Sequence, residues 1–322
     1  MKTSPGGMPI AGEPSPGVAA MADGAKKQQQ SAEIRQHPMS EQGENKPVVT
    51  LDEIVAYKRE EVERAKAARP LDELKTLIEE LGRPRNLFGA VTKHDRADHT
   101  AVIAEIKRRS PSAGLIRPEY EGDGFDPTVI ARAYHEAGAS AISCLTDEKF
   151  FGGDLSYIHK VRDAVPIPVL RKDFIIDPYQ VWESRAFGAD AILLIAECLT
   201  ESEMVDLMIL AHELQLTALV ETHDMDSLLR VRPHVGFPAR SYMLLGINNR
   251  DLKTMTTDLS HTLRMVDLVD DPKVLVSESG IKTHADLVKL RSHGVRIALV
   301  GESLMREADP GAALRALLNS DG

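Results

Sequence analysis

The sequence predicts an α/β protein built on a closed (β/α)8 barrel, and three observations support this fold class. From about residue 100 onward, eight short apolar runs alternate with amphipathic stretches of helical periodicity. The runs are almost continuously apolar, which is typical of parallel strands covered on both faces. Eight strand–helix units within roughly 220 residues match the size of one barrel domain. An open, doubly wound sheet is the alternative, but no GxGxxG motif follows the first run.

The first 48 residues differ from the rest in composition. Residues 1–48 contain six Pro and six Gly, no Leu and no aromatic residue, and their five acidic and five basic side chains balance. Such a segment buries too little apolar surface to offset the entropy lost on ordering. We therefore expect a disordered tail over 1–48 and a single barrel domain over 49–322.

A helical extension is expected ahead of the barrel, at about residues 50–82. Thr50 and Glu53 have the spacing of a capping box, and apolar residues follow at helical intervals. A second helix begins after Pro70 and ends at Gly82. We expect these two helices to cover one end of the barrel.

The barrel elements follow in strict alternation. The expected strands are Ala101–Ile106, Ala141–Leu145, Pro168–Leu170, Ala191–Ile195, Ala218–Val220, Tyr242–Ile247, Val274–Val276 and Ile297–Val300. The clearest helices between them are Val129–Ala137, Tyr179–Phe187, Thr200–Leu214 and Thr283–Ser292. Two of these helices follow an Asp-Pro pair, which is typical of a helix start.

Composition excludes several classes of function. The net charge of −10, from 49 acidic and 39 basic residues, argues against a general nucleic-acid-binding protein. Cys144 and Cys198 lie in apolar surroundings without metal-ligand spacing, so we expect neither a disulfide nor a metal site. No apolar run is long enough to cross a bilayer, and no secretory signal is recognised. We expect a cytoplasmic protein without membrane partners, and a monomer by default.

Charged and amide side chains gather where the expected strands end, which is where barrel enzymes place their active sites. These residues are Glu105, Lys107, Lys172, Glu221, Asn248, Arg250 and Glu278. Glu105 and Lys107 alternate with apolar neighbours, so both face the same side of their strand. Polar residues also follow strands simply because loops are polar. For Lys107, Lys172, Glu105 and Glu221 we favour a functional role, because charges at the edge of an apolar barrel are costly unless they are paired or used.

Small residues after the last two strands indicate a phosphate site. Ser279 and Gly280 follow the seventh strand, and Gly301 and Ser303 follow the eighth. Turns of this kind expose backbone N–H groups to a phosphate, and barrels frequently bind phosphate at this position. Each pair taken alone is also a plain turn, so the prediction rests on their joint position.

Taken together, these motifs resemble one family, the indole-3-glycerol phosphate synthases of tryptophan biosynthesis, over residues of about 50–320. The matching segments are Ile103–Ser112, Leu145–Gly153, Val169–Phe174, Leu219–Glu221, Gly246–Leu252, Ser277–Ile281 and Val300–Met305. They occur in the order found in the family. The tail and the extra Glu121–Phe125 stretch depart from the family pattern without touching a motif residue.

The resemblance implies a reaction and a set of roles. The substrate is 1-(2-carboxyphenylamino)-1-deoxyribulose 5-phosphate, which is closed to indole-3-glycerol phosphate with loss of carbon dioxide and water, and no cofactor or metal is implied. Lys172 is the expected proton donor, with Glu221 orienting it or acting as base. Glu105 and Lys107 are assigned to dehydration, and Asn248 and Glu278 to the substrate hydroxyls and the reacting centre. Phe151 and Phe174 should pack on the anthranilate ring. The phosphate or the benzoate should be surrounded by Ser110, Ser279, Gly280, Gly301 and Ser303. Arg250 is expected as a further cation at the site.

Three rival functions make different predictions. Phosphoribosylanthranilate isomerase chemistry requires a Cys–Asp pair, and no Cys ends the first strand. A flavin-binding barrel predicts a yellow protein. A barrel that only binds a sugar phosphate predicts binding without product.

Overall fold

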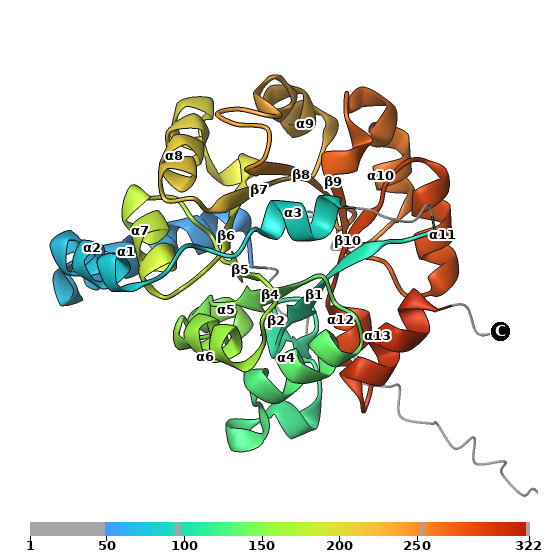
Figure 1. Ribbon diagram of the computed structural model, residues 1–322, viewed down its shortest axis with the longest axis horizontal. Helices are drawn as coiled ribbons and strands as arrows, with labels where there is room; N and C mark the ends of the chain where they lie inside the picture. Colours follow the sequence, from blue (N-terminus) through green and yellow to red (C-terminus); the bar gives the residue numbers. More distant parts are fainter. Residues whose placement is uncertain (1–48, 94–97, 252–253, 255, 320–322) are drawn as a thin grey trace, which may run out of the picture. The chain divides into compact units, whose positions relative to one another are not determined.

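The computed structural model describes residues 49–93, 98–251, 254 and 256–319, and its centre is a closed barrel of parallel strands (Figure 1). The strands follow one another around the barrel in the order β1-β10-β9-β8-β7-β6-β5-β4. They are β1 (Ala101–Ile106), β4 (Ala141–Leu145), β5 (Val169–Lys172), β6 (Ala191–Ile195), β7 (Thr217–Thr222), β8 (Met243–Asn248), β9 (Leu275–Glu278) and β10 (Ile297–Val300). The predicted fold class is confirmed, and the first and last residues of each expected strand lie within two residues of those observed. The expected tail, residues 1–48, lies outside the described residues.

Alternation along the strands divides the barrel core into two layers. On β1, Ala101 and Ile103 belong to the cluster inside the barrel, whereas Val102, Ala104 and Ile106 pack outward against the helices. Both sets are buried, which explains why the strands read as continuous apolar runs. The same alternation sends Glu105 to the inner side, at the carboxyl end of the strand.

Helices surround the barrel, and most begin at a side-chain cap. They are α4 (Pro127–Glu136), α6 (Ser156–Ala164), α7 (Pro178–Ala186), α8 (Glu201–Glu213), α9 (Met225–Val231), α10 (Ser260–Met265), α11 (His284–Ser292) and α13 (Pro310–Leu318). Asp126, Thr200 and Thr283 accept hydrogen bonds from backbone N–H groups of the first turn that would otherwise have no partner. Within the described chain, no helix is both long and apolar enough to traverse a membrane.

The helical extension contacts both the inside and the outside of the barrel. Helices α1 (Leu51–Ala68) and α2 (Leu71–Glu80) run beside α7 (Figure 1). Val62 and Leu74 form a cluster with Tyr179 on the outside, whereas Ile54, near the start of α1, joins the cluster inside the barrel. A third helix, α3 (Leu87–Thr92), was not predicted. Its Leu87 joins the core inside the barrel, and its Phe88 N–H donates to Thr217 Oγ1 at the start of β7 (3.3 Å), so α3 covers the amino-terminal end.

The loop after β1 contains the extra stretch noted in the sequence. A short hairpin, β2 (Arg109–Ser110) with β3 (Gly114–Leu115), precedes two turns, η1 (Pro118–Tyr120) and η2 (Gly122–Gly124). Phe125 is buried against Tyr120, with ring centroids 5.4 Å apart. The stretch is therefore anchored to the outer core rather than to the inside of the barrel.

Candidate active site

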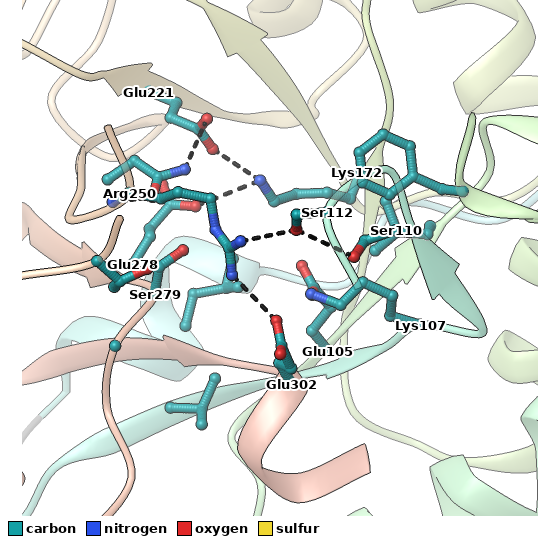
Figure 2. Close-up of a pocket in the computed structure, with 18 of the residues that line it drawn as sticks. Glu105, Lys107, Ser110, Ser112, Lys172, Glu221, Arg250, Glu278, Ser279 and Glu302 are labelled. Carbon is teal, nitrogen blue, oxygen red and sulfur yellow. Dashed lines mark hydrogen bonds and ion pairs between the residues drawn. The ribbon is translucent and has the colours of Figure 1, made fainter. Parts of the chain in front are cut away.

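A pocket of about 580 Å³ opens at the carboxyl ends of the strands (Figure 2). All the site residues expected from the sequence line it: Glu105, Lys107, Ser110, Phe151, Lys172, Phe174, Glu221, Asn248, Arg250, Glu278, Ser279, Gly280, Gly301 and Ser303. Parallel strands bring their carboxyl ends to one rim, so residues far apart in sequence meet there. The N-terminal extension contributes Val49, Leu51 and Ile54 to the wall.

Lys172 lies at the centre of the polar side of the pocket, and its position follows from strand alternation. Its neighbour Arg171 points outward from β5 and contacts Glu183 of α7 at 2.9 Å, so Lys172 faces the inside of the barrel. Lys172 Nζ donates to Glu221 Oε2 at 2.7 Å, and Asn248 Nδ2 donates to Glu221 Oε1 at 3.1 Å (Figure 2).

The protonation states of this cluster are set by burial and by neighbouring charge. Burial opposes the charge of Lys172, but its acidic neighbours, above all the Glu221 carboxylate at 2.7 Å, outweigh burial and raise the pKa of the amine. Burial likewise opposes ionisation of Glu221, yet Lys172 and His223 hold the pKa of Glu221 well below its usual range. Lys172 is thus an ammonium ion beside an ionised Glu221.

Glu278 behaves in the opposite way from Glu221. Burial and the neighbouring charge of Glu221 together raise the pKa of Glu278 well above its usual range. Its Oε2 lies 3.4 Å from Lys172 Nζ. Two adjacent buried carboxyls do not both ionise, so Glu278 carries the proton and this contact is not a full ion pair.

Glu105 and Lys107 form a second acid–base pair across the pocket. Lys107 Nζ is 2.7 Å from Glu105 Oε1, and both side chains are largely buried. A Cβ on Gly301 would lie 2.3 Å from Glu105 Oε1, so the absence of a side chain at Gly301 makes room for this carboxylate. The position of Glu105 at the end of β1 therefore depends on a glycine directly after β10.

Two aromatic rings form the apolar wall of the pocket. Phe151 and Phe174 have ring centroids 6.1 Å apart and are tilted by 40°. Phe151 ends the short helix α5 (Glu148–Phe151), whose first turn is capped by Asp147 through Phe150 N (2.7 Å) and Phe151 N (3.2 Å). A flat apolar group fits beside these rings.

The opposite side of the pocket is made of turns with small residues. Ser279 and Gly280 after β9 both have left-handed backbones, with φ of 66° and 78°. Ser303, in α12 (Glu302–Met305), donates to Ile281 O at 2.8 Å and so ties the turns after β9 and β10 together. This arrangement brings the four residues expected at a phosphate site, Ser279, Gly280, Gly301 and Ser303, to one side of the pocket.

Arg250 bridges this side to the loop after β1. Its guanidinium donates to Ser112 Oγ at 2.9 Å and to Glu302 Oε2 at 3.0 Å (Figure 2). Ser110 Oγ lies 3.4 Å from Ser112 Oγ. Arg250 and Ser110 are thereby held near each other at the mouth of the pocket.

Sequence reasoning missed some residues of the pocket, above all His223 and Glu302. His223 lies just beyond β7 and two residues after Glu221, the spacing at which strand alternation brings side chains to the same side. That spacing was the available signal. Among the described residues, no cluster of three His, Cys, Asp or Glu side chains is arranged to hold a metal ion.

Comparison with known proteins identifies relatives over most of the chain. A family model described as indole-3-glycerol phosphate synthase matches residues 51–317. The indole-3-glycerol phosphate synthase of Rhodopirellula baltica is 44% identical over 270 residues, covering 84% of this chain and 99% of the relative. That of Rhodospirillum rubrum is 44% identical over 268 residues, covering 83% and 98%.

Solved structures share the fold at low sequence identity. A 3-hexulose-6-phosphate synthase superposes with a TM-score of 0.53 at 17% identity, covering 68% of this chain and 98% of its own. The tryptophan synthase alpha subunit of Legionella pneumophila superposes with a TM-score of 0.50 at 16% identity, covering 73% and 97%. These likenesses establish the barrel architecture alone.

Proposed function

The chain belongs to the indole-3-glycerol phosphate synthase family, and from this premise we propose how the pocket performs the family's reaction. The enzyme closes 1-(2-carboxyphenylamino)-1-deoxyribulose 5-phosphate to indole-3-glycerol phosphate, with loss of carbon dioxide and water, in tryptophan biosynthesis. The observation that supports the proposed roles is the buried contact between Lys172 and Glu221 at 2.7 Å. It places a charged proton donor at the centre of a pocket that offers both an apolar and a polar wall.

Substrate orientation follows from the two walls. We assign the anthranilate ring to Phe151 and Phe174, and the phosphate to the turns that contain Ser279, Gly280, Gly301 and Ser303. Ser110 and Arg250 lie at the mouth, where an anionic benzoate or phosphate group meets them. Holding the substrate at both ends brings the aromatic carbon to the ribulose carbonyl, and such orientation contributes several kcal/mol to a cyclisation.

Ring closure requires a proton donor for the carbonyl oxygen. As the aromatic carbon forms its bond to the carbonyl carbon, the oxygen takes a proton from Lys172 Nζ, and the Nζ–H bond breaks. Loss of carbon dioxide then restores aromaticity. Glu221 holds Lys172 in place and ionised.

Dehydration requires an acid for the departing hydroxyl and a base for a proton of the new ring. The pair of Glu105 and Lys107 holds both functions side by side at 2.7 Å. Glu278, which carries a proton, and Asn248 are assigned to hydrogen bonds with substrate hydroxyls near the reacting centre.

The reaction is tested by supplying the ribulose phosphate substrate to purified protein without added metal or cofactor and following indole fluorescence. We expect the fluorescence to rise with time. A flat trace from folded protein that still binds the substrate would contradict the proposal and indicate a barrel that only binds sugar phosphates. A yellow preparation would indicate the flavin alternative.

We further propose that the enzyme is a cytoplasmic monomer that binds neither nucleic acid nor membrane. The proposal is supported by the net charge of −10 and by two free cysteines, Cys144 and Cys198, neither of which is exposed. Light scattering on the eluting protein measures the mass directly, and a mass near 70 kDa, twice the chain's 35.3 kDa, would contradict the monomer.

A further inference from the structure

His223 has no role in the reaction described above, yet its ring lies between two carboxylates. Its Nδ1 is 3.1 Å from Glu197 Oε2, and its Nε2 is 3.1 Å from Glu221 Oε1. The side chain is only 7% exposed. Glu197 therefore lies behind the histidine, and Glu221 lies in front of it on the pocket side.

The ring is fixed in this position by its own backbone. Glu197, in the turn η3 (Ala196–Cys198) after β6, also accepts a hydrogen bond from His223 N at 2.8 Å. The other charged or titratable groups near His223 are Asp224 next to it in the chain, Glu278 from β9, and His261, whose Nε2 lies 2.9 Å from His223 O. Acidic side chains therefore predominate among its neighbours.

Each ring nitrogen of His223 lies beside a carboxylate: Nδ1 is hydrogen-bonded to Glu197 Oε2, and Nε2 is within ion-pair distance of Glu221 Oε1, which favours a protonated ring. A neutral imidazole has one N–H and would turn a lone pair toward the second carboxylate, whereas an imidazolium has a proton on each nitrogen. Burial opposes the charge, but Glu197 and Glu221 raise the pKa of His223 to about 10. The ring is thus a cation at neutral pH.

The two oxygens of Glu221 consequently serve different cations. Oε2 accepts from Lys172, while Oε1 meets His223 together with the amide of Asn248. When Lys172 gives its proton to the substrate, it becomes a neutral amine. Without another cation, Glu221 would then be an uncompensated buried charge, which is strongly unfavourable.

We propose that His223 is a positioning residue for ring closure: it is the permanent counter-ion of Glu221, which lets Lys172 release its proton without leaving that carboxylate uncompensated. This inference rests on the roles proposed above for Lys172 and Glu221. In the step itself an Nζ–H bond of Lys172 breaks and an O–H bond on the substrate forms, while the protons of His223 stay in place.

The test is His223→Gln, which keeps a hydrogen-bond donor of similar reach and removes the charge. We expect kcat to fall about tenfold, which corresponds to a change of about one pKa unit, and KM to change by less than about twofold. The acid limb of the kcat/KM profile should move to higher pH, because Glu221 without its cation takes up a proton more readily. A purely structural role would not move this limb.

The matched control is His234→Gln. His234 also contacts a glutamate, with Nε2 2.8 Å from Glu201 Oε1, but that pair is outside the pocket lining. Both kcat and the acid limb should be unchanged in this variant. Glu197→Gln leaves the His223 ring in place but removes a carboxylate that raises its pKa, so the ring is protonated less completely. The acid limb of the kcat/KM profile should therefore move in the same direction as in His223→Gln, but by a smaller amount.

Nitrogen chemical shifts of the His223 ring in the unaltered enzyme provide a measurement that requires no variant. Protons on both nitrogens at pH 8 are expected, and a neutral ring there would overturn the proposal. Unchanged kcat and acid limb in folded His223→Gln would overturn it as well. Glu221→Gln distinguishes failure of the proposed function from failure of this inference. Full turnover in Glu221→Gln would contradict the proposed role of Glu221. An inactive Glu221→Gln beside a normal His223→Gln would contradict only the role proposed for His223.

Discussion

Lys172, Glu221 and Glu278 share one buried space but carry unequal charges. Lys172 and Glu221 are ionised and Glu278 is protonated, because Lys172 and His223 both stabilise the charge of Glu221, whereas burial and that charge raise the pKa of Glu278. The cluster therefore holds two donors, Lys172 and Glu278, around a single acceptor. Neighbouring groups whose pKa values are pushed apart in this way can act as acid and as base at the same pH.

We expect Lys172→Met to lower kcat by about 100- to 10,000-fold while the protein stays folded. Methionine keeps most of the packing volume and removes the proton. The rate is measured by indole fluorescence and folding by circular dichroism. Normal turnover in folded Lys172→Met would remove this residue from the mechanism.

Gly301→Ala should disturb Glu105. A Cβ at this position would lie 2.3 Å from Glu105 Oε1 and 2.9 Å from Glu105 Cβ, so the carboxylate would have to move. We expect a loss of about 1–3 kcal/mol in the free energy of unfolding and a fall in kcat. The control is Gly82→Ala, where nothing lies within 4 Å. Equal stability and turnover in the two variants would show that Glu105 has room to move.

At the scale of elements, the N-terminal helix α1 is joined to the end of β5 through a buried lysine, Lys58. Lys58 is fully buried and lies 2.9 Å from each of Asp147 Oδ2 and Asp173 Oδ1. Asp147 caps α5, which carries Phe151, and Asp173 follows Lys172 directly. One side chain of the extension thus links the helix that carries Phe151 to the strand that carries Lys172.

We expect Lys58→Met to cost about 3–5 kcal/mol in the free energy of unfolding, because it leaves buried carboxylates without their cation. Although burial raises the pKa of Asp173, Lys58 and Arg171 lower it, so its stabilising contribution is present above the unfolded value near 3.9 and is lost as pH falls below it. Removing Lys58 raises that pKa, so acid unfolding should begin at higher pH.

The control on the same helix is Lys66→Met. Lys66 is 36% exposed and pairs with Glu63 and Asp177, so its loss should cost about 0–1 kcal/mol. Urea titrations at pH 7 and at pH 4 measure both variants. Equal costs for the two substitutions would mean that the buried contacts of Lys58 contribute no more than surface ion pairs.

The elements differ in how far the sequence predicts them. The strands are predictable because each is a short run buried on both faces, and the rim residues are predictable because they interrupt those runs. Helix α3 is not, since six residues that include Gly89 give no helical periodicity to recognise. His223 was missed because its partner Glu197 comes from another strand's loop, and only the closed barrel brings the two together.

For the whole molecule, the net negative charge contrasts with the cations that line the pocket. The chain carries a net charge of −10, yet three cations, Lys107, Lys172 and Arg250, line the pocket. Each of these cations contacts a carboxylate, at 2.7 to 3.0 Å. These cations are therefore paired with carboxylates, and under the proposed function an anionic group of the substrate that bound Arg250 would compete with Glu302.

Deleting residues 1–45 should leave kcat, KM and the melting temperature nearly unchanged, with a shift in Tm below about 2 °C. The residues proposed to contact the substrate lie between Glu105 and Ser303, the described pocket wall begins at Val49, and the family model begins to match at residue 51. The cut also preserves Val49 and the capping box of Thr50 and Glu53.

A longer deletion, of residues 1–56, makes the comparison decisive. It removes the cap at Thr50, the pocket-lining Leu51 and the buried Ile54, so the melting temperature and substrate affinity should both fall. If the shorter deletion already has this effect, residues 1–45 contribute to the stability of the barrel, and the boundary expected at residue 48 is wrong. If neither deletion has an effect, the start of α1 contributes nothing to the pocket it lines.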